Sequence, residues 1–196
     1  DDRILETPGI ALQSTVREVA RMGEIVAESL QVAKGVLFTL KEEEISFLKE
    51  EETTVDKLSA GITGYAIKLS GLQISEKEHQ DVAHLLQMVS DIERISDYCE
   101  NISEFAESLY EKKASFSEVG SAQLKEMFEV CVDSYQYAYE AFVEQNREKA
   151  LKVIEKETQA DDLEITLRSR HIKRLASNQC ETEAGIVFLD TLVCLE

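Results

Sequence analysis

Proline is nearly absent from this 196-residue sequence, occurring once, and glycine occurs only eight times. Both residues interrupt helices, and sandwich or barrel folds need many turns. The scarcity therefore predicts long uninterrupted helices and an all-α fold. With 43% hydrophobic residues, the chain has enough apolar side chains to build an ordinary core.

Basic residues are also scarce relative to acidic ones, 21 against 39, which gives a formal net charge of −18. A chain with this balance repels nucleic-acid backbones and anionic lipid headgroups. We therefore expect no nucleic-acid partner. Most of the acidic side chains are expected to lie on solvated helix faces.

Long apolar segments and paired cysteines are missing as well. No stretch of about 18 consecutive apolar residues could span a bilayer, and no export signal with a basic start is visible at the N-terminus. We therefore expect a cytoplasmic location. The cysteines form no C-x-x-C pair, which argues against a zinc knuckle or a disulfide framework. We expect reduced core thiols at Cys99, Cys131, Cys180 and Cys194.

Local signals place the first three helices. Thr7 can cap a helix that begins at Pro8 and runs to about Thr39. A second helix is predicted from about Glu43 to Ser70-Gly71 because apolar residues recur there at helical spacing.

The third helix is predicted to begin after a capping box formed by Ser75 and Glu78, and to run to about Glu111. The small and serine-rich segment 113–120 is the predicted linker. Three more helices are expected after it.

The sequence repeats itself at an offset of 105 positions. The pattern E-x-E-T-x-x-D-x-L occurs at 50–58 and again at 155–163, and an offset of 103 aligns 85–93 with 188–196. One offset that serves two consecutive helices favours duplication over chance. The sequence thus predicts two tandem three-helix bundles. Their bounds are 1–112 for the first, 113–120 for the linker and 121–196 for the second, whose last helix is cut short.

Acidic residues four positions apart are repeated together with the helices. Glu52 falls on the apolar stripe of the second helix, and Asp56 lies one turn further on the same side. Glu93 and Asp97 form the same pair in the third helix. The repeat-related acidic positions in the second half are Glu157, Asp161 and Glu196.

Like charges on one helix face repel and need compensation. For a single pair, bonding to lysine or arginine is the ordinary explanation. Three pairs at repeated positions favour a second explanation, since carboxylate oxygens converging from two helices suit Mg²⁺, Mn²⁺, Ca²⁺ or iron.

Catalytic motifs are not found. The sequence contains no Glu-x-x-His pair of a di-iron site, no glycine-rich phosphate loop and no G-x-S-x-G elbow. His171 falls on an inward stripe and is expected to be a hydrogen-bonded core residue. We therefore expect no enzymatic activity, although a metal-dependent phosphate-ester hydrolase stays open as an alternative.

The segment DIERISDYCENI at 91–102 resembles the signature of the PhoU family, D-x-E-R-I-G-D-x-x-x-N-I, with Ser96 where glycine is usual. This resemblance implies an all-α fold of two three-helix repeats and a role in regulating phosphate uptake. It also implies metal ions, namely iron, zinc, manganese or magnesium, at the acidic pairs. The implied ligands are Glu52, Asp56, Glu93, Asp97, Glu157, Asp161 and Glu196. The sequence stops where an arginine and an aspartate would be expected next, and Leu195-Glu196 could itself be a cloning remnant.

The segment DRILETPGIAL at 2–12 is similar to the L-x-E-T-P-x-x-A-L stretch that precedes the PhoU-like domain of bacterial sodium/phosphate cotransporters. It implies a regulatory domain on the cytoplasmic side of the inner membrane, with the membrane transporter domain of the same chain as partner. A free-standing adaptor in a phosphate-uptake and sensor complex and a plain structural helical module are the alternatives. A homodimer is compatible with each of these roles.

Overall fold

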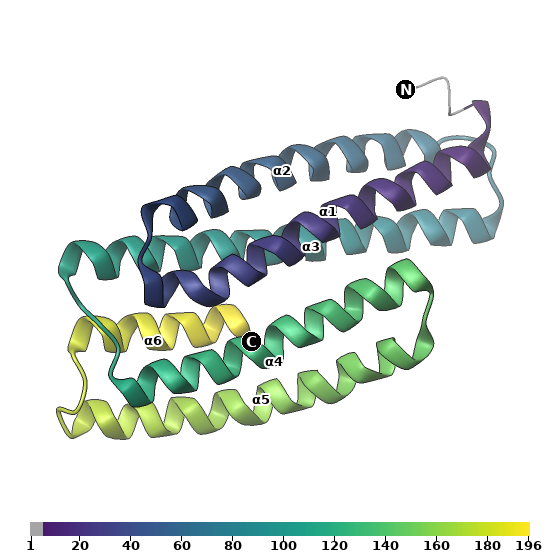
Figure 1. The fold of residues 1–196 in the computed structure, drawn as a ribbon. Coiled ribbons are helices and arrows are strands. Elements are labelled where there is room, and N and C mark those ends of the chain that lie inside the picture. Colours follow the sequence, from purple (N-terminus) through teal and green to yellow (C-terminus); the bar gives the residue numbers. More distant parts are fainter. Residues whose placement is uncertain (1–5) are drawn as a thin grey trace.

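The computed structural model describes residues 6–196 and confirms the all-α fold expected from the sequence. Six helices account for nearly all of the described chain (Figure 1). None of them is long and apolar enough to cross a membrane. The first part of the transporter-like stretch, 2–5, lies outside the described residues. The helices are α1 (Pro8–Thr39), α2 (Glu42–Ser70), α3 (Glu76–Lys112), α4 (Glu118–Glu144), α5 (Arg147–Ala176) and α6 (Thr182–Leu195).

The first three helices pack on one another, as do the last three, and the two groups lie side by side along their length (Figure 1). Contacts of α1 with α4 and of α3 with α6 join the groups. The main core is continuous across this boundary, because Phe128 and Val187 of the second group belong to the same buried cluster as Met22 and Val89 of the first. The two repeats therefore form one body.

Helix ends follow the local signals with one exception. Ser75 accepts a hydrogen bond from the backbone N–H of Glu78, and the Glu78 carboxylate accepts one from the Ser75 N–H, so the capping box is confirmed. The prediction of a Thr7 side-chain cap is wrong. The backbone carbonyl of Thr7 instead accepts from the N–H groups of Ile10 and Ala11, because Pro8 already supplies a helical φ at the first position.

The connection between the two groups is shorter than the predicted 113–120. Helix α4 begins at Glu118, because the Ser117 hydroxyl accepts from the N–H of Gly120 and starts the helix there. Lys113 adopts a left-handed conformation that ends α3. Serine thus acts as a helix cap in this segment, where the sequence reading took it for linker.

A side-chain hydrogen bond links α4 to the backbone of α1. The Tyr135 hydroxyl donates to the backbone carbonyl of Gly23 at 2.8 Å. A Cβ on Gly23 would approach the Tyr139 ring to 3.0 Å, so glycine is the residue that allows this close approach of the two helices.

The short helix α6 is held by an aromatic and imidazole stack. His171 of α5 is 2% exposed and lies parallel to the Phe188 ring at a centroid distance of 4.0 Å. Its Nε2 bonds to the Gly185 carbonyl and its Nδ1 accepts from Arg174, both at 3.0 Å. The prediction of a hydrogen-bonded core histidine is confirmed.

Candidate metal centre

Three carboxylates predicted as ligands come together between α2 and α3. One oxygen each from Glu52, Asp56 and Asp97 lies within 4.8 Å of the other two. Oxygens that share a Mg²⁺ or Ca²⁺ ion lie about 3 to 5 Å apart, given metal–oxygen distances of about 2.0 to 2.6 Å. The spacing and the donor type therefore fit a hard cation, and we refer to these three residues as the carboxylate triad.

Helical spacing and buried neighbours bring the triad together. Glu52 and Asp56 project from the same side of α2 because they are four residues apart. Val55, between them in sequence, is fully buried and fixes the rotation of α2 against its neighbours. On α3, Ser96 is 1% exposed and places the adjacent Asp97 at the edge of the interface. The four-residue spacing within α2 and the packing of α2 on α3 therefore bring the three carboxylates together.

The acidic residues around this point disfavour one another's ionised form. Burial raises the pKa of Glu52 above its usual value, and the nearby Asp56 and Glu100 raise it further. Burial and then Asp56 raise the pKa of Asp97. The pKa of Glu93 is raised by burial and then by Asp97 and Asp56. The ionised forms of these neighbouring carboxyl groups are therefore destabilised.

Glu100 belongs to this acidic group and was missed by the sequence reading. Its pKa is raised by burial, Glu104 and Asp97, against a small lowering by Lys49. Glu100 lies three residues after Asp97 and seven after Glu93, so helical periodicity could have found it. The E-x-x-x-D pattern does not include Glu100, so a search for that pattern alone does not find it.

Basic side chains do not neutralise the group. Among residues 6–196, no lysine, arginine or histidine nitrogen lies within 4.0 Å of a carboxylate oxygen of Glu52, Asp56, Glu93, Asp97 or Glu100. Lys49, whose charge lowers the pKa of Glu100, bonds to Glu107 at 2.7 Å. Salt bridges within the described chain therefore leave the repulsion uncompensated.

Without a cation, this repulsion should make stability depend on pH. The folded-state pKa values of Glu52 and Asp97 are raised, so the folded protein binds more protons than the unfolded chain above about pH 4. The stability that these two protonated carboxyl groups contribute to the folded state is fully present below the unfolded pKa and is lost as the pH rises through the folded pKa. We expect Glu52→Gln with Asp97→Asn to raise the melting temperature in a chelator at pH 7.5, and to change it much less at pH 4.5. Circular dichroism melts at the two pH values measure this difference. An advantage of the variant that shrinks as the pH rises would contradict the account.

The repeat-related carboxylates of the second half do not form an equivalent triad. Glu157, Asp161 and Glu196 are exposed and line one cavity of about 370 Å³ beside the end of α6. Within the described residues, only the α2–α3 triad brings three potential ligand atoms within 4.8 Å.

Comparison with known protein families finds one match in each half of the chain. Residues 19–106 and 124–196 each match the sequence model of the PhoU domain. The chain belongs to the PhoU family. The resemblance inferred from 91–102 is therefore confirmed, and the first PhoU match contains the triad.

Relatives and solved structures agree with the family assignment. The PhoU homolog 1 of Thermotoga maritima, a phosphate-specific transport system accessory protein, is 27% identical over 173 residues, covering 88% of this chain and 74% of that protein. The putative inorganic phosphate export protein YjbB of Salmonella typhimurium is 27% identical over 143 residues, or 72% of this chain, which spans about a quarter (26%) of that protein. Crystal structures of PhoU share the fold. The one from Streptococcus pneumoniae superposes with a TM-score of 0.85 at 19% identity, covering 97% of this chain and 88% of that one. The one from Pseudomonas aeruginosa does so with 0.88 at 16% identity, covering 95% and 89%.

Proposed function

We propose that this PhoU-family chain is a regulatory accessory module of phosphate transport, not an enzyme, and that a cation held by its carboxylate triad controls its activity. The convergence of Glu52, Asp56 and Asp97 within 4.8 Å, without a basic partner in the described residues, carries the proposal. The family match and the phosphate-transport names of the relatives support the regulatory role.

The triad lets α2 and α3 respond to cations. A bound cation supplies the positive charge that the carboxylates lack. Glu52 and Asp56 of α2 and Asp97 of α3 would be its ligands, with Glu93 and Glu100 adding negative potential beside it. When the carboxylates are ionised and uncompensated, they push the two helices apart. The seam between α2 and α3 is therefore the element whose packing depends on occupancy.

Glu157, Asp161 and Glu196 are proposed as a second, weaker ligand set at the α6 cavity. Iron, zinc, manganese and magnesium are the candidate ions for either set, and carboxylate-only coordination favours the harder ones.

We propose a membrane transporter domain as the regulated partner, on the cytoplasmic side of the membrane. The sodium/phosphate cotransporter type is the specific form suggested by the L-E-T-P stretch. Association into a homodimer is compatible with the same role.

Binding of the ion can be tested directly by titration calorimetry. Mn²⁺ and Mg²⁺ are added to protein treated with a chelator and then dialysed. We expect saturable binding by the wild type, and at least a tenfold loss of affinity for Glu52→Gln with Asp97→Asn, because truncating two of three charged ligands removes most of the attraction. The control, Glu28→Gln with Asp162→Asn, makes the same charge change at two exposed positions that form no ion pair with another described residue, and it should bind normally.

The regulatory role has its own readout in cells. Uptake of radiolabelled phosphate is measured in cells whose own copy carries the triad variant, grown in high and in low phosphate. We expect the response of uptake to external phosphate to be lost in the triad variant and kept in the control. Normal regulation in cells whose purified triad variant binds no cation would reject the link between the ion and transport.

A further inference from the structure

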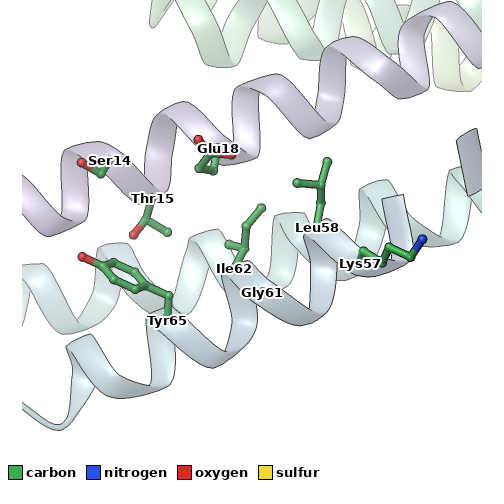
Figure 2. Close-up of a pocket in the computed structure, with 8 residues that line it drawn as sticks. All are labelled: Ser14, Thr15, Glu18, Lys57, Leu58, Gly61, Ile62 and Tyr65. Carbon is green, nitrogen blue, oxygen red and sulfur yellow. The ribbon is translucent and has the colours of Figure 1, made fainter. Parts of the chain in front are cut away.

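A second cavity, of about 440 Å³, lies between α1 and α2, and none of its lining residues belongs to the acidic group of the proposed metal centre. Ser14, Thr15 and Glu18 line it from α1, and Lys57, Leu58, Gly61, Ile62 and Tyr65 line it from α2 (Figure 2). A volume of this size is typical of pockets for small molecules. Nothing in the regulatory proposal uses it.

Oxygen atoms gather at one end of this cavity. The Tyr65 hydroxyl is shielded from solvent and has no hydrogen-bond partner among the described residues. Figure 2 shows the hydroxyls of Ser14, Thr15 and Tyr65 grouped at this end. The Thr15 hydroxyl donates to the Ala11 carbonyl at 2.9 Å, so its oxygen remains free to accept. A buried unpaired hydroxyl is costly, which makes this end receptive to a ligand group that donates hydrogen bonds.

The charges favour a cationic donor at that end. Glu18 lies one helical turn further along α1 than Ser14, next to the hydroxyl group on its inner side (Figure 2), and its ion pair with Arg21 is exposed on both sides (54% and 50%). Exposed pairs of this kind contribute little and are readily exchanged for a ligand. The net charge of −18 also draws cations to the surface. A primary ammonium has three donors to share among such oxygens.

The other end of the cavity has the opposite requirement. Lys57 lies eight residues before Tyr65, about 12 Å along the helix axis, and makes no ion pair with any described residue. Between the ends, Leu58 and Ile62 form apolar walls, and a Cβ on Gly61 would meet no atom within 4 Å. The middle of the cavity is therefore apolar and open, and its far end is suited to an anion.

We propose that the α1–α2 cavity binds a small zwitterion whose ammonium sits among the hydroxyl oxygens of Ser14, Thr15 and Tyr65, on the side towards Glu18, and whose anionic group, about 10 Å away across an apolar body, faces Lys57. Amphiphilic amino acids and short apolar peptides have this chemistry. A diamine is disfavoured because Lys57 repels its second charge, and a simple carboxylate leaves the hydroxyl end unsatisfied. The cavity shares no lining residue with the carboxylate triad.

Titration calorimetry with 8-aminooctanoate tests the proposal, with octanoate and 1,8-diaminooctane as comparisons. We expect saturable binding of the zwitterion, and binding at least tenfold weaker for each comparison, since each lacks one of the two charge contacts. Tyr65→Phe should weaken binding of the zwitterion about fivefold, which is the loss of one hydrogen bond. Absence of heat at millimolar zwitterion, or equal binding of octanoate, would overturn the proposal.

A matched pair of glycine variants separates a blocked site from a damaged fold. Gly61→Leu places a side chain in the cavity and should abolish binding, while leucine's higher helix propensity keeps or raises the melting temperature. Gly64→Leu makes the same change one turn away, at a position that is also open but does not line the cavity, and should bind normally. Normal zwitterion binding by Gly61→Leu would refute the site, and Mn²⁺ binding by both variants should match the wild type.

Discussion

A hundredfold excess of a divalent cation over its dissociation constant should raise the melting temperature of the protein by roughly 5–10 °C. Binding to the folded state alone contributes about 2.7 kcal/mol at that excess. One kcal/mol shifts the melting temperature of a domain of this size by about 2–4 °C. The effect arises at the α2–α3 seam, where Glu52, Asp56 and Asp97 converge and no basic side chain of the described residues compensates them. Differential scanning calorimetry with Mn²⁺ or with chelator measures it.

The triad variant gives this prediction its sharpest control. Glu52→Gln with Asp97→Asn should lose the cation-dependent rise while melting above the wild type in chelator at neutral pH, because the repelling charges are gone. The variant of Glu28 and Asp162 should keep the full rise. A rise of equal size in the triad variant would assign the stabilising ion to another site, with Glu157, Asp161 and Glu196 as the next set to neutralise.

Replacing Phe188 by alanine should cost about 3–5 kcal/mol of unfolding free energy, the range for large aromatic residues in cores. Phe188 is fully buried, stacks on His171 at 4.0 Å and touches Phe116 in an edge contact at 6.5 Å. The Arg174 guanidinium lies 5.5 Å above its ring. Helix α6 has only 14 residues, so it depends on few anchors. The melting temperature should fall by roughly 10 °C.

Two outcomes distinguish a lost anchor from general damage. Ile186→Ala, at a neighbouring α6 position that is 51% exposed, should change stability little. In the Phe188→Ala protein, hydrogen exchange should rise first in α6 and in α5 around His171, while the α2–α3 seam stays protected. Equal losses of stability in the two variants, or uniform exchange over all six helices, would argue against Phe188 as the anchor of α6.

The helices could be read from the sequence because their signals are local. Apolar residues at helical spacing, the capping box at Ser75 and the scarcity of proline each act within one or two turns, and the observed bounds of α1, α2 and α3 agree with the predicted ones within a residue. The linker was misjudged for the same reason. A serine reads as loop or as helix cap, and only the conformation at Ser117 shows which role it has.

The site could be predicted only in part. Spacing of four residues put Glu52 and Asp56 on one side of α2 and put Glu93 and Asp97 on one side of α3. It could not say which pairs face each other, since that depends on the rotation and crossing of two helices. Packing selects Asp97 to complete the triad, leaves Glu93 at its flank and adds Glu100.

The sequence by itself determined the all-α class, the duplicated order of helices and the PhoU family, because periodicity, repeats and motifs are properties of the chain alone. Tertiary structure alone decided that the two repeats share one core and that three carboxylates meet in the first repeat, and it decided that the Tyr65 hydroxyl finds no hydrogen-bond partner among residues 6–196 beside an open cavity. These features depend on distances between helices that are remote in sequence, and such distances are set by the sum of many packing contacts.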